Sequence, residues 1–459
     1  MLTTLTNPAN GEVVETVPQA DAAEVGRAVT AAHARYASGV WRAAPVRERR
    51  DVLRGIADLI RRDHERLARL ESVNTGKPLA AARGEINAVA ATFDFYAGAV
   101  DKIHGQTIPV QARGSLFTFR EPIGVCAAIV PWNFPMLILG WKVAPALTMG
   151  NSVVAKPAEL TPLTGLALAE LALEAGLPQG VFSVVTGKGS EAGDALVRHP
   201  LVRKVSFTGS TEVGSQVMAV AAANVKRVSL ELGGKSANVI FGDADLDVCI
   251  ASSLWSVYDN AGQDCCARTR MIVDRSIFEE VVDRFVEATT HIRVGDPMAE
   301  TTEMGPLISA PHRDRVESYL EIGAAEGARL VTGGKRLDST GHFLTPAVLI
   351  DVTPDMKVMQ EEIFGPVVGI IAFDTEEEAI QLANDSVYGL SGSLWTRDLA
   401  RALRVSRALE TGMLSVNSSS SVHIEAPFGG MKQSGIGREQ GMVALEHYSE
   451  LKSVFISET

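Results

Sequence analysis

The chain has 459 residues, which is enough for about three domains of the usual size of ~150 residues. Hydrophobic residues make up 46% of the chain and charged residues 21%, a composition typical of folded globular proteins that excludes a disordered or fibrous one. With 43 Lys and Arg against 55 Asp and Glu the net charge is −12, and an acidic chain without a basic block offers no surface to the phosphates of nucleic acid.

The N-terminal third begins with a long helical region. Residues 21–105 are rich in Ala, Arg and Glu at spacings typical of surface helices. Short β-branched runs then alternate with helical segments, and we expect strands at 123–130, 152–155, 181–185, 204–207 and 227–230. The clearest helix is 162–175, with Thr161 as N-cap, Pro162 at its first position and Gly176 just past its end. This alternation predicts a parallel sheet with ligands at the carboxyl ends of its strands.

The same alternation returns from residue 235 to residue 431. We expect strands at 270–273, 367–373 and 413–416 and a helix at 277–290, which together predict a second α/β domain. The serine run 418–421 is interpreted as a mobile loop. The apolar run 451–456 is a strand without a sequence-local partner, so we expect it to pair with a distant element, with another subunit as one candidate.

The sequence favours a reducing, aqueous compartment. Four cysteines in so long a chain are too few for a disulfide framework. The first residues lack the basic and apolar regions of a signal peptide. Residues 123–141 carry no charge and are long enough to suggest a membrane span, but Pro131, Asn133 and Pro135 in the middle would break a helix. We therefore expect a soluble, cytoplasmic protein.

Two glycine-rich turns each follow a strand and open a helix. The first, 187–193, is one residue wider than the dinucleotide-binding fingerprint, and the second is 207–214. In the second, Gly209 allows a close approach of the backbone to a pyrophosphate, and Ser210 supplies a donor. The alternative for both segments is a tight turn that needs positive φ.

Charged residues follow the second expected strand, where a ribose would lie. A carboxylate at Glu159 would accept both ribose hydroxyls and repel a 2′-phosphate, which favours NAD over NADP. The neighbouring Lys156 argues the other way, because it would bind that phosphate. Each residue, taken alone, is also consistent with a solvated surface charge.

Cys265 is the candidate nucleophile. Its neighbours in the segment 260–266 include Gly, Gln and Asp, which suit an exposed loop better than a packed strand, although an isolated cysteine is more often an inert core residue. The side chain of Cys266 is expected to point elsewhere. No metal site is expected, since no other Cys or His stands at ligand spacing.

Two further residues stand at the ligand edge of the expected sheet. Glu231 follows the fifth strand, where a carboxylate would activate water. Asn133 follows the first strand, and its amide would donate to a developing oxyanion. A capped strand end is the alternative for Glu231, but an amide, a carboxylate and phosphate-binding turns facing one crevice favour catalysis.

Seven motifs, in order, resemble those of the NAD(P)-dependent aldehyde dehydrogenase superfamily over nearly the whole chain. They are PWNFP at 131–135, KPAE at 156–159, FTGS at 207–210, ELGGK at 231–235, GQDC at 262–265, EEIFGP at 361–366 and PFGGMKQSGIGRE at 427–439. The resemblance implies an α/β fold with a Rossmann-type cofactor domain (1–103 and 123–233), a second α/β catalytic domain (234–448) and a small β oligomerisation element (104–122 and 449–459). It also implies a homodimer or homotetramer.

The resemblance implies the chemistry of the site as well. Cys265 would attack an aldehyde to give a thiohemiacetal, whose oxyanion Asn133 and the Cys265 N–H would hold. Glu231 would activate the water that hydrolyses the resulting thioester, and Lys142 and Glu439 would relay protons behind it. The presence of Glu231 favours hydrolysis to a free acid over acyl transfer to coenzyme A.

The cofactor implied is NAD, with NADP as the alternative. Lys156 and Glu159 would contact the adenosine ribose, Ser210 the pyrophosphate, Glu362 the nicotinamide ribose and Phe364 the region of the ring. The remaining cofactor contacts expected on this basis are Pro131, Trp132, Gly189, Gly209, Leu232 and Gly233.

The expected substrate is a small aliphatic or ω-amino aldehyde. Phe134, Trp141 and Phe428 would line its tunnel, and Asp94 and Glu425 would offer carboxylates to a cationic aldehyde, with surface charge as the alternative for both. Four other functions remain open: a coenzyme A-acylating aldehyde dehydrogenase, an NADP-preferring semialdehyde dehydrogenase, a cofactor-free thiol hydrolase and a non-enzymatic binding protein.

Overall fold

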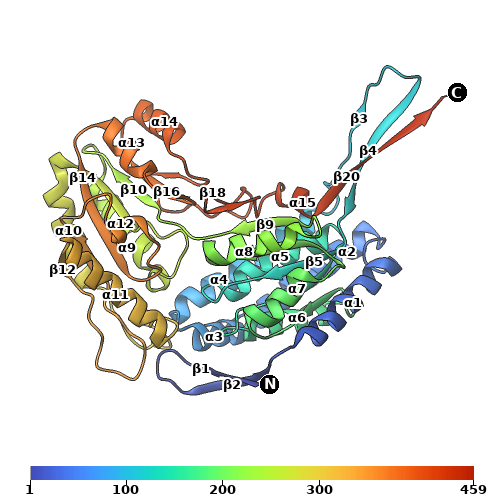
Figure 1. The fold of residues 1–459 in the computed structure, drawn as a ribbon, viewed down its shortest axis with the longest axis horizontal. Helices are drawn as coiled ribbons and strands as arrows, with labels where there is room; N and C mark the ends of the chain where they lie inside the picture. The colour runs from blue at the N-terminus through green and yellow to red at the C-terminus, as the bar shows by residue number, and fades with distance from the viewer. Residues whose placement is uncertain (1, 459) are drawn as a thin grey trace.

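A computed structural model describes residues 2–458. It contains a six-stranded sheet, a seven-stranded sheet and a three-stranded arm that projects from the body and carries the C-terminus (Figure 1). Two-stranded sheets join β1 (Leu2–Thr6) to β2 (Val13–Pro18) and β15 (Tyr388–Gly389) to β18 (Met431–Lys432). The α/β fold expected from the sequence is confirmed.

Helices occupy most of the N-terminal hundred residues, as predicted. They are α1 (Ala22–Ser38), α2 (Val46–Arg62), α3 (His64–Thr75) and α4 (Leu79–Ala99). α1 begins after Asp21 because the side chains of Asp21 and Glu24 form a reciprocal capping box. It ends at Gly39, which takes the left-handed conformation at φ 79°.

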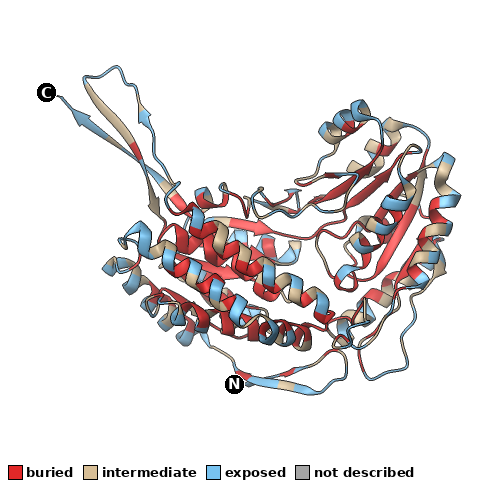
Figure 2. Ribbon diagram, turned by 180° about the vertical axis from the view of Figure 1, so that it is seen from behind, coloured by how far each residue is buried: buried red, intermediate tan, exposed pale blue. Residues whose placement is uncertain are grey.

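The six-stranded sheet has the order β19-β9-β8-β5-β6-β7, and the strands from β9 to β7 run parallel. These strands confirm the five predicted ones: β5 (Val125–Ile129), β6 (Ser152–Lys156), β7 (Phe182–Val184), β8 (Val202–Thr208) and β9 (Arg227–Glu231). Between them lie α5 (Pro135–Thr148), α6 (Leu163–Glu174), the single-turn π-helix η1 (Gly189–Gly193), α7 (Asp194–Arg198) and α8 (Thr211–Ala222). The strands and the inward faces of these helices are buried (Figure 2).

The start of α6 differs by one residue from the prediction. Pro162 is the N-cap rather than the first helical residue, and no side chain caps the helix. The hydroxyl of Thr161 is buried and has no hydrogen-bond partner among residues 2–458, so Thr161 is not the cap. Gly176 follows the helix at φ 94°, the conformation that its placement past the end required.

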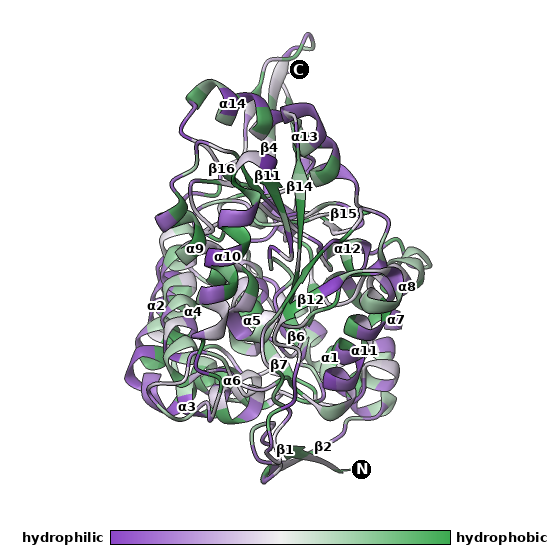
Figure 3. Cartoon of the chain, turned by 90° about the vertical axis from the view of Figure 1, so that its left-hand side faces the viewer, coloured by the Kyte–Doolittle hydropathy of each residue, from purple (hydrophilic) through white to green (hydrophobic). Residues whose placement is uncertain are grey.

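The seven-stranded sheet has the order β12-β13-β14-β11-β10-β16-β17 and confirms the second α/β region. Its strands are β10 (Ala237–Ile240), β11 (Arg270–Asp274), β12 (Arg329–Thr332), β13 (Ala347–Ile350), β14 (Val367–Phe373), β16 (Gly392–Trp395) and β17 (Ser415–Val416). The helices with it are α9 (Leu246–Tyr258), η2 (Asp259–Gly262), η3 (Arg275–Ile277), α10 (Phe278–Thr290), α11 (Ala310–Glu326), α12 (Lys357–Gln360), α13 (Glu376–Asn384) and α14 (Leu399–Ala408). β14 is hydrophobic along its length, as expected of a buried parallel strand (Figure 3).

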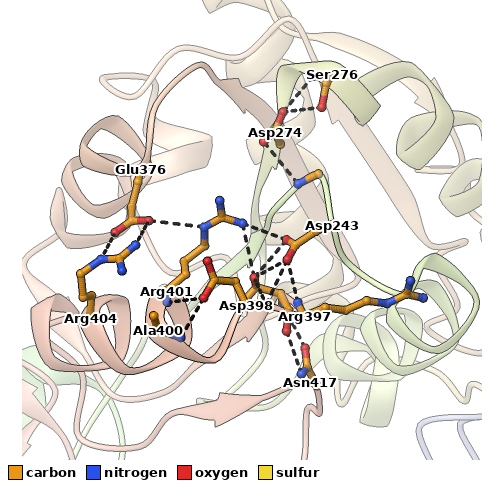
Figure 4. Close-up of polar contacts among 12 residues, drawn as sticks. Asp243, Asp274, Ser276, Glu376, Arg397, Asp398, Ala400, Arg401, Arg404 and Asn417 are labelled. Carbon is orange, nitrogen blue, oxygen red and sulfur yellow. Dashed lines mark hydrogen bonds and ion pairs between the residues drawn. The ribbon is translucent and has the colours of Figure 1, made fainter.

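A polar cluster centred on Asp243 fastens α14 to the end of this sheet. The Asp243 carboxylate accepts hydrogen bonds from the hydroxyl of Thr396, from the amides of Arg397 and Asp398, and from Arg401 Nη1 at 2.9 Å (Figure 4). Burial alone would raise the pKa of Asp243, but these hydrogen bonds and the Arg401 charge outweigh it and leave the pKa below its usual value.

The arm consists of β3 (Thr107–Ile108), β4 (Gly114–Pro122) and β20 (Ser449–Ser457), which follows the short helix α15 (Ala444–His447). The predicted C-terminal strand therefore exists, and along its whole length it pairs antiparallel with β4 of the same chain. The domain division expected from the sequence stays a prediction, and the strand β19 (Gly435–Ile436) runs across it. This strand lies within the range 234–448, but it pairs with β9 in the six-stranded sheet.

Within residues 2–458, no helix is long and apolar enough to cross a membrane. The uncharged stretch 123–141 is divided between β5 and the first half of α5, with Pro135 at the start of the helix.

Candidate active site

Two cavities meet at Cys265, in the space between the carboxyl ends of the six-stranded sheet and the loop that precedes β11. The crevice cavity measures about 240 Å³, and its lining residues are Pro131, Trp132, Asn133, Ile138, Thr208, Gly209, Ser210, Leu232, Gly233, Cys265, His312, Arg315, Glu362 and Phe364. The tunnel cavity measures about 430 Å³, and its lining includes Phe134, Trp141, Glu231, Cys265, Cys266, Phe428 and Glu439. The structure thus brings together side chains that are distant in the sequence.

A sharp bend in the chain places Cys265 at this junction. Asn260, Ala261 and Gly262 all have positive φ, at 49°, 58° and 70°. At Gly262 a Cβ atom would lie 2.9 Å from Pro366 N, so the close approach of the two loops requires glycine there. A hydrogen bond with the Cys266 thiol and burial raise the pKa of the Cys265 thiol well above its usual value.

Cys266 does not point away from the site, contrary to the prediction. Its side chain is buried and lines the tunnel cavity beside Cys265. The neighbouring Asp264 accepts a hydrogen bond from Cys266 N at 2.9 Å. One ligand-type atom from each of these three residues lies within 4.8 Å of the others, so the loop concentrates polar atoms at the cavity wall.

Asn133 is buried in the loop between β5 and α5, and its position is fixed from three sides. Its side-chain amide donates to the carbonyl of Gln263 at 2.9 Å. Its own carbonyl accepts from Lys77 Nζ at 2.9 Å and from Asn260 Nδ2 at 3.0 Å. An amide group has two N–H bonds, so one remains available toward the cavity that Asn133 and Cys265 share.

Glu231 ends β9 and presents a buried carboxylate to the tunnel cavity. Neither of its oxygens has a hydrogen-bond partner among residues 2–458. Burial and the nearby charge of Glu439 raise the pKa of Glu231 well above its usual value. A carboxylate whose pKa is raised is a stronger base than an exposed one, which suits a general base.

Lys142 and Glu439 form a buried ion pair behind Glu231. Lys142 Nζ also lies 3.2 Å from Ser206 Oγ, which donates to Glu439 Oε1 at 3.0 Å. Glu439 lines the tunnel cavity, whereas Lys142 is fully buried behind it. These groups extend a polar path from the cavity into the interior.

The crevice cavity has the features of an anion- and diol-binding site. Ser210 is the N-cap of α8 and accepts from Val213 N at 3.4 Å, so the amide end of this helix faces the cavity. Glu362 accepts from Gly234 N at 3.0 Å, and burial raises the pKa of Glu362 to about 7. Phe364 holds a left-handed conformation at φ 60°, and its ring meets that of Trp132 edge-on at 5.3 Å.

A third cavity, the outer cavity of about 590 Å³, lies between the ends of β5 and β6 and the helices η1, α7 and α8. Lys156 and Gly189, which were expected on the adenosine side of a cofactor, both line this cavity. Lys156 Nζ donates to the carbonyls of Pro157 and Gly187, and burial lowers its pKa to about 8. Glu159 is not among the residues that line this cavity; it accepts a hydrogen bond from Gln19 at 3.2 Å.

The three aromatic residues expected at a substrate tunnel line this cavity, whereas the two carboxylates expected there do not. Phe134, Trp141 and Phe428 all contribute, with the rings of Trp141 and Phe428 5.1 Å apart. Asp94 is instead engaged by Arg61 in an ion pair at the surface, and Glu425 is exposed and is not among the lining residues. Their positions in the sequence gave no information on which helix face or loop side meets the cavity.

Three other carboxylates, which sequence reasoning missed, line the tunnel cavity. They are Glu85, Asp259 and Asp264. Burial raises the pKa of Glu85 to about 8, and Lys77 Nζ donates to both of its oxygens. Asp264 stands inside the GQDC motif and was within reach of a sequence argument, whereas Glu85 and Asp259 carry no local signal.

Comparisons with known proteins agree with this geometry. A family profile described as "Aldehyde dehydrogenase family" matches residues 3–454. Human retinal dehydrogenase 2 is 47% identical over 453 residues, which is 98% of this chain and 88% of that protein. Betaine aldehyde dehydrogenase of Bacillus subtilis is 43% identical over 455 residues, covering 98% and 93%. A crystal structure of betaine aldehyde dehydrogenase from Staphylococcus aureus in complex with NAD+ superposes with a TM-score of 0.98 at 41% identity, covering 99% of this chain and 91% of that one.

Proposed function

The chain belongs to the aldehyde dehydrogenase family and is an NAD-dependent oxidoreductase, and from this premise we propose that Cys265 is the nucleophile that attacks the aldehyde. The observation that carries the proposal is that Cys265 lines both the crevice cavity and the tunnel cavity. A sulfur at their junction reaches a substrate in the tunnel and a cofactor in the crevice. Asn133 is on one side of it and Glu231 on the other.

The residues present fit a dinucleotide. Gly233 leaves room for the Glu362 carboxyl group, since a Cβ atom there would lie 2.8 Å from Glu362 Cδ. The carboxylate is thereby placed to accept both hydroxyls of the nicotinamide ribose. The α8 N-terminus with Ser210 offers amides to the pyrophosphate. When bound, the nicotinamide supplies the acceptor for the hydride that leaves the substrate carbon.

The chain's own groups then account for bond formation at the aldehyde. The Cys265 thiol gives its proton to water in the tunnel cavity, and the thiolate attacks the carbonyl carbon, so that a C–S bond forms as the C=O π bond opens and the oxygen gains negative charge. The second N–H of the Asn133 amide and the Cys265 backbone N–H stabilise that oxygen. Asn133 needs to move little in order to stabilise this oxygen, because Lys77 and Asn260 already fix its backbone carbonyl.

Glu231 is proposed to activate the water that cleaves the thioester on Cys265. Its two oxygens are buried without partners among residues 2–458, so a water molecule that enters the tunnel meets an acceptor that no protein donor occupies. The raised pKa of Glu231 makes its carboxylate a better acceptor for the proton of that water. The proton then leaves through Glu439 and Lys142. A water-activating carboxylate at this place yields a free acid and disfavours acyl transfer to coenzyme A.

Absorbance at 340 nm with an aldehyde and NAD tests these roles. Cys265→Ser should abolish NADH formation, while Cys266→Ser, the matched thiol control one residue away, should retain activity within about tenfold. Glu231→Gln should give a burst of about one NADH per site followed by turnover slowed at least a hundredfold, because the thioester forms but is not hydrolysed. Full activity of Cys265→Ser would contradict the assignment, as would equal losses in both cysteine variants.

We propose a small aliphatic or ω-amino aldehyde as the substrate. Three aromatic side chains supply apolar contact and ring faces that attract a cationic group on the substrate. The expected result is a kcat/KM at least tenfold higher for 4-aminobutyraldehyde than for benzaldehyde. A preference of more than tenfold for neutral aldehydes such as hexanal would count against the ω-amino group.

We also propose that the arm makes the enzyme a homodimer or homotetramer. The arm projects from the body (Figure 1) and carries exposed apolar side chains, among them Phe119, Leu451, Phe455 and Ile456. Light scattering of the purified protein should give a mass of two or four chains, and Leu451→Glu with Phe455→Glu should lower it. A monomeric wild type would refute the proposal.

A further inference from the structure

Arg268 lies three residues after Cys265 and is buried at 4% exposure. Its guanidinium donates to the carbonyl of Cys266 at 3.0 Å, to the carbonyl of Ser419 at 2.9 Å, to Ser421 Oγ at 2.8 Å and to Ser393 Oγ at 3.3 Å. Within residues 2–458 it forms no ion pair. Its hydrogen-bond acceptors are all neutral oxygens, with the carboxyl group of Asp264 as a nearby charge. Loss of one acceptor would leave a buried donor of the guanidinium without a partner.

Two of these partners belong to the serine loop, residues 418–421, which the sequence suggested would be mobile. In the structure, side chains and carbonyls of this loop form hydrogen bonds at several points. Ser419 Oγ and Ser252 Oγ of α9 are 2.8 Å apart, Ser421 Oγ and Ser391 Oγ are 3.0 Å apart, and Ser415 Oγ donates to the carbonyl of Ser420 at 2.8 Å. The loop is therefore fastened to α9 and to the residues before β16, with Arg268 at its centre.

The two sides that Arg268 joins are both walls of the tunnel cavity. Cys266, whose carbonyl it binds, lines the cavity, and so does Val422, which directly follows the serine loop. One planar guanidinium group therefore connects the Cys266 wall to the loop that leads into Val422. The crevice cavity is built from other segments, and none of the serine-loop residues lines it.

We propose that Arg268 is a positioning residue that sets aldehyde specificity by holding the serine loop, and with it Val422, against the catalytic cysteine loop. The inference rests on the proposed function, because it takes the tunnel cavity as the aldehyde site. It requires Arg268 to act on the aldehyde side of the reaction while leaving cofactor binding unaffected. A lysine cannot replace it, since one ammonium group does not span the carbonyl of Cys266 and the hydroxyl of Ser421 at once.

Steady-state kinetics of Arg268→Gln and Arg268→Lys with propanal and phenylacetaldehyde test the proposal. Both variants should raise KM for propanal about tenfold and reduce the discrimination between the two aldehydes at least fivefold, because a released wall admits the bulkier group. KM for NAD should stay within twofold of the wild type. Parallel losses in the aldehyde and NAD parameters would show a general structural role and overturn the proposal.

A double-mutant cycle with Ser421→Ala separates the serine-loop contact from the others. Ser421→Ala alone should shift aldehyde discrimination in the same direction, and combining it with Arg268→Gln should add less than twofold, because the bond is already lost. The matched control is Ser38→Ala, whose hydroxyl donates to the carbonyl of Arg35 within α1, a helix that contributes no residue to the tunnel cavity. Independent, multiplicative effects of the two changes would contradict the coupling. Absence of NADH formation by the wild type would instead refute the proposed function itself.

Discussion

Gly233→Ala isolates the proposed role of Glu362 in cofactor binding. The new Cβ would lie 2.8 Å from Glu362 Cδ and 3.0 Å from its Oε1, whereas ordinary contacts begin at 3.4 Å. The carboxyl group must therefore retreat by about 0.6 Å or more. This shift is possible because the atoms concerned form the end of a flexible side chain, so the protein should still fold.

The magnitude follows from the hydrogen bonds to the ribose hydroxyls that a displaced Glu362 would lose. Glu362 accepts from Gly234 N at 3.0 Å, and a displacement of this size takes the contact out of hydrogen-bond range. Hydrogen bonds to a charged group contribute about 1.5–3 kcal/mol, which corresponds to roughly a tenfold to hundredfold loss of NAD affinity when the ribose loses its acceptor.

The predicted loss of NAD affinity can be checked by titrating NAD and following protein fluorescence. KM for NAD and the melting temperature should be measured in parallel. The control is Gly26→Ala in α1, where an added Cβ meets no atom within 4 Å. NAD affinity of Gly233→Ala within threefold of the wild type would refute the reasoning, because the carboxylate would then not be needed where the structure places it. A large fall in melting temperature would show that the alanine disturbs the fold instead.

Two further predictions concern titration and stability. Because Cys265 and Glu231 have raised pKa values and act when deprotonated, the rate should rise with pH, and its acid limb should lie at higher pH than the ordinary pKa of an exposed carboxyl group would give. Glu439→Gln removes a like charge, lowers the pKa of Glu231 and should move the acid limb of the pH–rate profile to lower pH; an unmoved or opposite limb would exclude this coupling. Asp243→Asn should lower the melting temperature by about 2–4 °C near neutral pH, since the bonds to Arg401 and the loop amides weaken. The native pKa of Asp243 is lowered, so its contribution is present above the unfolded pKa of about 3.9 and is lost as pH falls through the native pKa. The difference between variant and wild type should shrink accordingly in calorimetry at acid pH.

The local pattern of hydrophobic, Gly and Pro residues was enough to predict much of the fold. The five strands from β5 to β9 and the strand β14 follow from β-branched runs bounded by Gly or Pro, because strand formation in a buried parallel sheet depends on a continuous apolar segment. The motif order placed Asn133, Glu231 and Cys265 at the ends of strands or on loops at the ligand edge. The carboxyl ends of parallel strands share one edge, so their convergence there was predictable.

Contacts across long sequence separations were not predictable from the sequence. Three features depend on how helices, strands and loops pack against one another. They are the pairing of β20 with β4, the presence of Cys266 in the tunnel cavity, and the presence there of Glu85 rather than Asp94. Glu85 and Asp94 stand on the same helix, α4, and nothing in their local sequence separates the one inside from the one outside.

The sequence by itself therefore determined the elements, their order and the chemical groups that reach the sheet edge. Only the tertiary structure decided which of those groups share a cavity and that the serine loop is held by Arg268. The physical reason is that secondary structure follows from the periodicity of neighbouring residues, whereas the position of a side chain in a cavity follows from packing between segments that are far apart along the chain.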